Sequence, residues 1–192
     1  MRLLVATSNQ GKLKEVREIL GGPGLPLELV SLTDLGLPAP PETGNTFHDN
    51  AAEKATTSAR RSGLCVDALG GAPGLHSARY APTDEARRAK LLSALKDVPV
   101  ERRGAHFQAA IALSDPEGKR VFPAEGRVDG AIALEPRGSG GFGYDPLFLP
   151  AETPGRTLAE LGSEEKNRLS HRGRALEQLR PTLVRLARDG TL

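Results

Sequence analysis

A glycine-rich stretch, Gly138–Pro146 (GSGGFGYDP), constrains the fold of this chain more than any other sequence feature. Four of its first six residues are glycine, and an aromatic residue, a glycine, a second aromatic residue and a carboxylate fill positions 142–145. Glycine adopts positive φ angles and lets other groups approach the backbone closely. The stretch holds two aromatic residues of a chain that has only 5 Phe, 2 Tyr and no Trp.

The pattern has two interpretations. An aromatic ring on a glycine platform, next to the carboxylate of Asp145, is what the binding of a planar heterocycle needs: stacking on one face and hydrogen bonds at one edge. Alternatively, the stretch is a glycine-rich hairpin whose Phe142 and Tyr144 enter the core, since glycine-rich matches are weak signals by themselves. The local sequence leaves both interpretations open.

Composition narrows the class of protein. A chain of 192 residues that is 38% hydrophobic and 26% charged is typical of a soluble globular domain, or of two closely joined lobes. The net charge of +2 argues against a nucleic-acid-binding module, which needs a basic stripe. No apolar run approaches the roughly 20 residues of a membrane span, and the strand-like N-terminus predicts no signal peptide. The single cysteine, Cys65, fits a reducing cytoplasm and is expected to be a small buried residue rather than a nucleophile.

The N-terminus predicts a strand, a polar loop and a helix. Residues 3–6 (LLVA) form a short apolar run typical of a buried strand. Residues 7–12 (TSNQGK) are polar, and apolar side chains then recur at helical spacing over residues 13–20. The polar loop is therefore expected at the N-terminus of a helix, where free N–H groups and the helix dipole favour an anion.

The residues of this loop favour a phosphate over a simple helix cap. Ser8 or Asn9 can cap the helix, and Lys12 places a cation in its first turn. A cation there opposes the helix dipole, so it needs a compensating anion. The loop does not match the Walker A pattern, so a simple cap stays open as the alternative.

The rest of the chain alternates between strand and helix patterns, which predicts an α/β fold. Strands are expected at residues 27–32, within 62–69 after a turn, and at 105–113, 119–134 and 147–149. Helices are expected at about 47–61, from 84 to 95, at 157–161, from a capping start at Ser163, and after an interruption at 170–173.

Several motifs along the chain, each weak alone, together resemble the inosine triphosphate pyrophosphatase family, which hydrolyses aberrant purine nucleoside triphosphates such as ITP, dITP and XTP. The matching segments are Ala6–Lys12, Glu42–Phe47, Asn50–Ala51 with Lys54, Ser62–Leu64, Leu69–Gly74, Ser77–Tyr80, the glycine-rich stretch, Glu165–Lys166 and Ser170–Gly173. They follow the family's order over nearly the whole chain.

This resemblance implies a fold and an activity. The expected fold is a single pyrophosphatase domain over residues 1–192, an elongated mixed β-sheet with flanking helices and two lobes around a central nucleotide cleft. The expected reaction releases pyrophosphate and the nucleoside monophosphate. Family members use Mg²⁺, and they imply a cytoplasmic homodimer here.

The resemblance also assigns roles to residues. The phosphate-binding residues would be Thr7, Ser8, Asn9, Lys12 and Lys54, with Ser62 also among the substrate-binding residues. The base-binding residues would be Phe142, which stacks on the purine, Gly143, Tyr144, Asp145, Lys166, His171 and Arg172. Glu42 would help to hold Mg²⁺. Water attack on a phosphoryl group depends on a metal ion, cations and a carboxylate that orients the water.

One departure leaves the catalytic residue unidentified. In the family, a strand ending in Asp-Asp runs into the Ser-Gly-Leu motif, and these acids serve as metal ligand and general base. Here Arg60 and Arg61 precede Ser62, and the interval from Asn50 is about ten residues shorter, the size of a strand and its turn. Either the sequence as given lacks that strand, or the protein is a nucleotide-binding homologue with impaired hydrolysis. Asp67 belongs to a structural strand in the family pattern, so the role does not transfer to it.

We expect the base pocket to select a 6-keto purine, because His171 and Arg172 can donate hydrogen bonds to O6. The 6-amino group of adenine would instead present a donor to a donor, and such mismatches can reject an analogue by up to about 10⁴–10⁵. The measurement is kcat/KM for ITP and for ATP. Comparable values for the two nucleotides would contradict the assignment.

Overall fold

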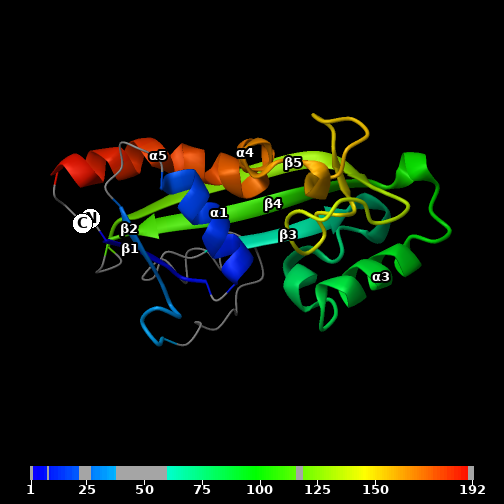
Figure 1. Cartoon of the computed structure of the whole chain (residues 1–192), viewed down its shortest axis with the longest axis horizontal. Coiled ribbons are helices and arrows are strands. Elements are labelled where there is room, and N and C mark those ends of the chain that lie inside the picture. The colour runs from blue at the N-terminus through cyan, green and yellow to red at the C-terminus, as the bar shows by residue number, and fades with distance from the viewer. Residues whose placement is uncertain (1, 8, 22–26, 38–59, 116–118, 190–192) are drawn as a thin grey trace. The chain divides into compact units, whose positions relative to one another are not determined.

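The computed structural model describes residues 2–7, 9–21, 27–37, 60–115 and 119–189, and it confirms an α/β fold with flanking helices (Figure 1). The chain divides into two compact units. The first unit comprises residues 1–61, 109–126 and 172–192, and the second comprises 62–108 and 127–171. Within the described ranges, no helix combines the length and apolarity needed to cross a membrane.

The described strands form two sheets that include both strand orientations. The strands are β1 (Arg2–Val5), β2 (Glu28–Ser31), β3 (Arg60–Val66), β4 (Gly104–Ser114), β5 (Val121–Ile132) and β6 (Phe148–Pro150). β1 and β2 pair in parallel, with Arg2 opposite Glu28. The other sheet has the order β3-β4-β5-β6, and its β5–β6 pair is antiparallel, with Gly130 opposite Pro150. Parallel and antiparallel pairs are therefore both present among the described strands, in two sheets.

Four α-helices and four short 3₁₀ turns accompany the strands. The helices are α1 (Gln10–Leu20), α3 (Asp84–Ala94), α4 (Ser163–Leu169) and α5 (His171–Asp189). The 3₁₀ turns are η2 (Asp67–Leu69), η3 (Gly74–Arg79), η4 (Val100–Arg102) and η5 (Leu158–Glu160). These counts refer to the described residues.

The core of the first unit forms where α1 and α5 place their apolar stripes against strands. The stripe of α1 is Leu13, Val16, Ile19 and Leu20, and that of α5 is Leu176, Leu179, Leu183 and Leu186. They pack with buried residues of β1, β4 and β5, including Val5, Ile111 and Ala124. In Figure 1, α5 runs alongside β4 and β5. The three- and four-residue spacing of these apolar residues predicts both helices.

The second unit has its own core, built on aromatic and leucine side chains. Phe107 of β4 and Phe148 of β6 are buried, with ring centroids 4.7 Å apart. Leu91 and Leu95, from α3 and the residue that ends it, are fully buried in the same cluster. Tyr144 of the glycine-rich stretch also belongs to this core.

Two expectations about local structure are wrong. Arg60 and Arg61 begin strand β3 instead of ending a helix, and Ser62 and Gly63 lie inside that strand instead of in a turn. β3 pairs with β4, so hydrogen bonds to a strand distant in sequence override the local preference here. Residues 47–59, the rest of the predicted helix, lie outside the described residues.

The boundary between the last two helices is also sharper than expected. Ser170 alone separates α4 from α5, and residues 171–173 form the first turn of α5 instead of an interruption. The Ser170 N–H donates to the Lys166 carbonyl, and its extended backbone turns the chain into the next helix. Ser163 is the first residue of α4, whose N-cap is Gly162. Pro181 lies within α5.

The pairing of β5 with β6 requires glycine at position 130. A Cβ added there would meet the Leu149 carbonyl oxygen and lie 2.8 Å from Cζ of Phe148. We expect Gly130→Ala to lower the free energy of unfolding by about 1–3 kcal/mol, because overpacking forces backbone shifts. Urea denaturation measures the change. The exposed neighbour Asp129 provides the control, and an equal effect of Asp129→Ala would contradict the explanation.

Candidate functional site

The N-terminus of α1 has the cap and the cation that the sequence predicts. Asn9 is the N-cap, and its Oδ1 accepts a hydrogen bond of 3.0 Å from the Lys12 N–H. The Asn9 N–H in turn donates to Oγ1 of Thr7 over 3.2 Å. The first turn contains no acidic residue, so nothing there opposes an incoming anion. Thr7, Asn9 and Lys12 are therefore brought together at this helix end.

A buried ion pair joins α1 to the start of α5 within the first unit. The Arg172 guanidinium donates from Nε and NH2 to the two carboxylate oxygens of Glu15, and the NH2–Oε1 distance is 2.9 Å. Both side chains are buried. This two-point geometry is the strong form of an arginine–carboxylate pair. Arg172 is thus engaged with α1, and its contact with the base stays a prediction.

A single carboxylate organises the glycine-rich stretch in the second unit. Oδ2 of Asp145 accepts from the Phe142 N–H and from Nζ of Lys166, both over 2.8 Å. Asp145 and Lys166 are buried, whereas Phe142 is half-buried. Nζ of Lys166 also lies 5.1 Å from the centroid of the Phe142 ring, within cation–π range.

Glycine is required at position 141 for this arrangement. Its φ is +73°, and an added Cβ would lie 2.9 Å from both Cγ of Asp145 and Nζ of Lys166. A side chain there would therefore intrude on the ion pair. Phe142 then follows directly on a backbone that only glycine can adopt without strain.

The core interpretation is confirmed for Tyr144, and the stacking interpretation stays a prediction for Phe142. Tyr144 is a core residue, and its hydroxyl donates to the Ser77 carbonyl over 3.1 Å. Burial raises the pKa of Tyr144, so the phenol stays a neutral donor. Its assignment to the base-binding residues stays a prediction. Phe142 is the ring that remains accessible for stacking.

His171 is buried in the second unit and stacks on Phe107. The two ring centroids are 4.7 Å apart and the planes are nearly parallel, at 5°. His171 thus has a fixed ring orientation at the start of α5. Its predicted contact with the base is untested by this geometry.

Comparison with known proteins identifies the family. The Ham1 family model matches residues 3–182. The chain belongs to the Ham1 family. A protein of Geobacter sulfurreducens named dITP/XTP pyrophosphatase is 50% identical over 195 residues, covering 95% of this chain and 96% of that protein. The family predicted from the motifs is therefore confirmed.

Solved Ham1 structures support the same assignment. A HAM1 protein from Coxiella burnetii matches with a TM-score of 0.82 and 39% identity, covering 96% of this chain and 99% of that one. A nucleoside-triphosphatase / dITP/XTP pyrophosphatase from Mycobacterium abscessus matches with a TM-score of 0.70 and 47% identity, covering 94% and 100%. These names give no support to the alternative of a homologue with impaired hydrolysis.

Several predicted residues of this Ham1 chain are not placed by the structure. Ser8, Glu42 and Lys54 lie outside the described residues, so their roles stay predictions. Ser62 is half-buried in β3. Within the described part of the chain, no three His, Cys, Asp or Glu side chains are grouped to hold a metal ion. The general base therefore stays unassigned.

The structure confirms the prediction for Cys65 and corrects the one for Asp67, which was expected in a strand. Asp67 is exposed in η2, immediately after β3, and lies against Gly104. Cys65 is buried, and burial raises the pKa of its thiol. A raised pKa disfavours the thiolate, so Cys65 is a packing residue and not a nucleophile.

Sequence reasoning missed two residues of α3 that contact the glycine-rich stretch. Oδ2 of Asp84 accepts from the Gly143 N–H over 2.8 Å, and NH1 of Arg88 donates to the Gly143 carbonyl over 2.8 Å. In the sequence, Asp84 reads only as a first-turn acid after the N-cap Thr83. No sequence signal connects it to a loop 59 residues away.

We expect Lys12→Ala to weaken triphosphate binding by about 10- to 100-fold, the usual size of a charge-assisted hydrogen bond. The measurement is the Kd for ITP by calorimetry without turnover. Lys14 is the matched control, because it is exposed on the same helix and pairs with Glu18 at a distance of 3.8 Å. Unchanged ITP affinity in Lys12→Ala would show that the phosphate assignment is wrong.

Proposed function

We propose that this protein hydrolyses aberrant purine nucleoside triphosphates, namely dITP, XTP and ITP, to the monophosphate and pyrophosphate. Its role would be to cleanse the nucleotide pool of deaminated purines. The observation that carries the proposal is the 50% identity to a dITP/XTP pyrophosphatase along nearly the whole length of both chains. The described residues add a candidate phosphate site and a candidate base site in support of this proposal.

The first unit has the features of a phosphate site. The α1 N-terminus offers a capped turn, free of acidic residues, with Lys12 in it. Helix N–H groups and a cation together stabilise the negative charge of phosphates and of the transition state. We assign phosphate binding to this helix end.

The second unit has the features of a base site. The Phe142 ring is half-buried and backed by the Lys166 ammonium, and a buried carboxylate fixes its backbone. Stacking on such a ring accepts any purine, so the choice among purines must come from hydrogen bonds at the base edge. We assign that choice to Lys166 and His171 of this unit, as the family resemblance implies. The role that the resemblance gives to Arg172, a residue of the first unit, stays a prediction.

Mg²⁺ is part of the proposal as the family's expected cofactor. Bound to the triphosphate, it would neutralise charge on the phosphoryl oxygens. The predicted ligand, Glu42, lies outside the described residues, and the described side chains include no group of three or more His, Cys, Asp or Glu that could hold a metal ion. We therefore assign no step of the reaction to a described metal ligand.

We also propose a homodimer that works in the cytoplasm, on the family resemblance and on the single cysteine. Sedimentation velocity of the purified protein measures the oligomeric state.

The proposed function is tested by steady-state assays with dITP, XTP, ITP and ATP, with and without Mg²⁺. We expect pyrophosphate release from the first three, little from ATP, and loss of activity with a chelator. The intact mass of the assayed protein must equal that of the 192 residues, because the interval before Ser62 lacks the family's Asp pair. Release of orthophosphate in place of pyrophosphate, or no turnover of any of the four, would overturn the proposal.

A further inference from the structure

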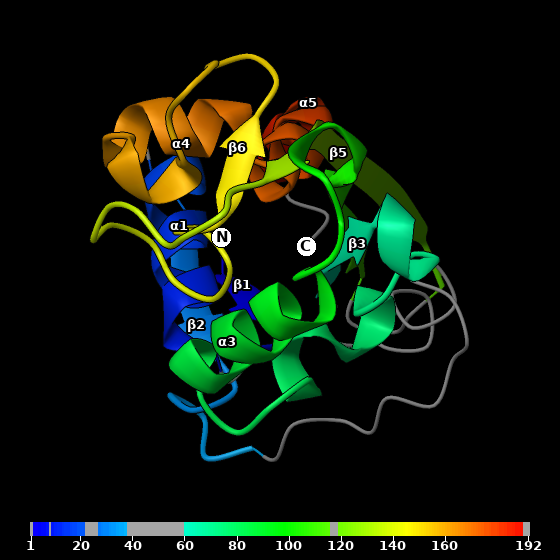
Figure 2. The ribbon, with the colours of Figure 1, turned by 90° about the vertical axis from the view of Figure 1, so that its right-hand side faces the viewer.

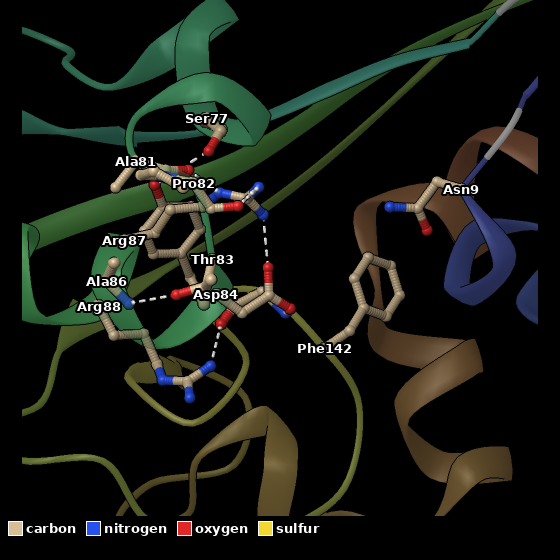
Figure 3. Close-up of polar contacts among 12 residues, drawn as sticks. Asn9, Ser77, Ala81, Pro82, Thr83, Asp84, Ala86, Arg87, Arg88 and Phe142 are labelled. Carbon is tan, nitrogen blue, oxygen red and sulfur yellow. Dashed lines mark hydrogen bonds and ion pairs between the residues drawn. The ribbon is translucent and has the colours of Figure 1, made fainter.

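Two side chains of α3 bind the two polar backbone groups of one residue in the glycine-rich stretch. The Gly143 N–H donates to Oδ2 of Asp84, and the Gly143 carbonyl accepts from NH1 of Arg88, both over 2.8 Å (Figure 3). Figure 2 shows this stretch passing beside α3. One acceptor and one donor, one helical turn apart, therefore engage both polar groups of one residue.

Asp84 is itself held in place by Arg87. NH1 of Arg87 donates to Oδ1 of Asp84, while its Nε donates to the Ala81 carbonyl over 2.9 Å. The arginine thus ties the carboxylate to the segment that leads into α3. Both oxygens of Asp84 are engaged, so the acceptor offered to Gly143 has a fixed direction.

These contacts determine the backbone of Phe142. Its own N–H is held by Oδ2 of Asp145, and the next N–H, that of Gly143, is held by Asp84. The two peptide groups that flank the Phe142 Cα are therefore each bound to a carboxylate, one buried and one half-buried. Fixing both peptide planes fixes φ and ψ at Phe142, and backbone angles in turn restrict the side-chain rotamer.

We propose that Asp84 and Arg88 are positioning residues that set the direction of the Phe142 ring, and through it the affinity for the purine base. This inference rests on the proposed function, since it takes Phe142 as the residue that stacks on the base. In Figure 3 the Phe142 ring projects away from the Asp84 cluster, so neither α3 side chain needs to touch the ring to orient it.

Other residues already fill the helix-capping role that a first-turn acid such as Asp84 could have. Oγ1 of Thr83 caps α3 by accepting from the Ala86 N–H over 3.1 Å. Glu85 is a second acid in the same first turn and is exposed. Glu85→Ala therefore removes the same charge from the same helix turn without touching the loop, and it is the matched control for Asp84→Ala.

The experiment compares the steady-state kinetics of wild type, Asp84→Ala, Arg88→Met and Glu85→Ala with XTP. We expect KM to rise about tenfold in the first two variants with kcat nearly unchanged, because stacking on the base lies outside the reacting bonds. Glu85→Ala should leave both constants at the wild-type values. Asp84→Asn, which keeps an oxygen for the Gly143 N–H, should recover part of the loss.

A second measurement is independent of turnover. Hydrogen exchange of the Gly143 amide should accelerate in Asp84→Ala and not in Glu85→Ala, and melting temperatures identify any variant that fails to fold.

The two proposals fail in different ways. Equal KM values and equal Gly143 exchange in Asp84→Ala and Glu85→Ala would overturn the positioning role. A fall in kcat with unchanged KM in both Asp84→Ala and Arg88→Met would also overturn it. Absence of XTP turnover in the wild type would overturn the proposed function, and with it the role in base binding.

Discussion

The glycine-rich stretch depends on one buried carboxylate, that of Asp145. A charge removed from water is costly unless it is paired and hydrogen-bonded, and Lys166 and the Phe142 N–H meet that requirement at the same oxygen. Such a pair adds little net stability, because desolvation offsets the attraction, but losing one partner leaves an uncompensated buried charge. The lysine, the carboxylate and the loop backbone therefore have to be present together, and Gly141 must have no side chain for them to meet.

The elements that were predictable from the sequence are those determined by local periodicity. The apolar spacing of α1 and the residues at its N-terminus are encoded within a dozen positions, so the helix and its Asn9 cap follow from the chain itself. The strand at Arg60–Arg61 was not predictable in this way. Its extended form depends on pairing with β4, more than 40 residues later, and such pairing leaves no mark on the local sequence.

The same distinction between local sequence and distant contacts applies to the candidate site. Thr7, Asn9 and Lys12 are neighbours in sequence, and their arrangement follows from helix geometry. Asp84 and Gly143 meet only because the second unit folds, so the contact could not be read from either segment. Family resemblance gave Phe142 and Lys166 a shared role in base binding, which stays a prediction, and the structure brings the two side chains within cation–π range. It did not indicate that Arg172 would be engaged with Glu15.

The Glu15–Arg172 pair also fixes the orientation of α1. Leucine and valine side chains alone would allow a helix to rotate about its axis or slide by one ridge at modest cost, because many apolar packings are nearly equivalent. The planar Arg172 guanidinium, bonded to both carboxylate oxygens of Glu15, restricts the rotation of α1 about its own axis to one orientation. The N–H groups at the start of α1 therefore point in a direction that is set four to six residues further along the helix. Since ligand groups need alignment within roughly 10–20°, the pair fixes the orientation of the helix end at which we propose that phosphate binds.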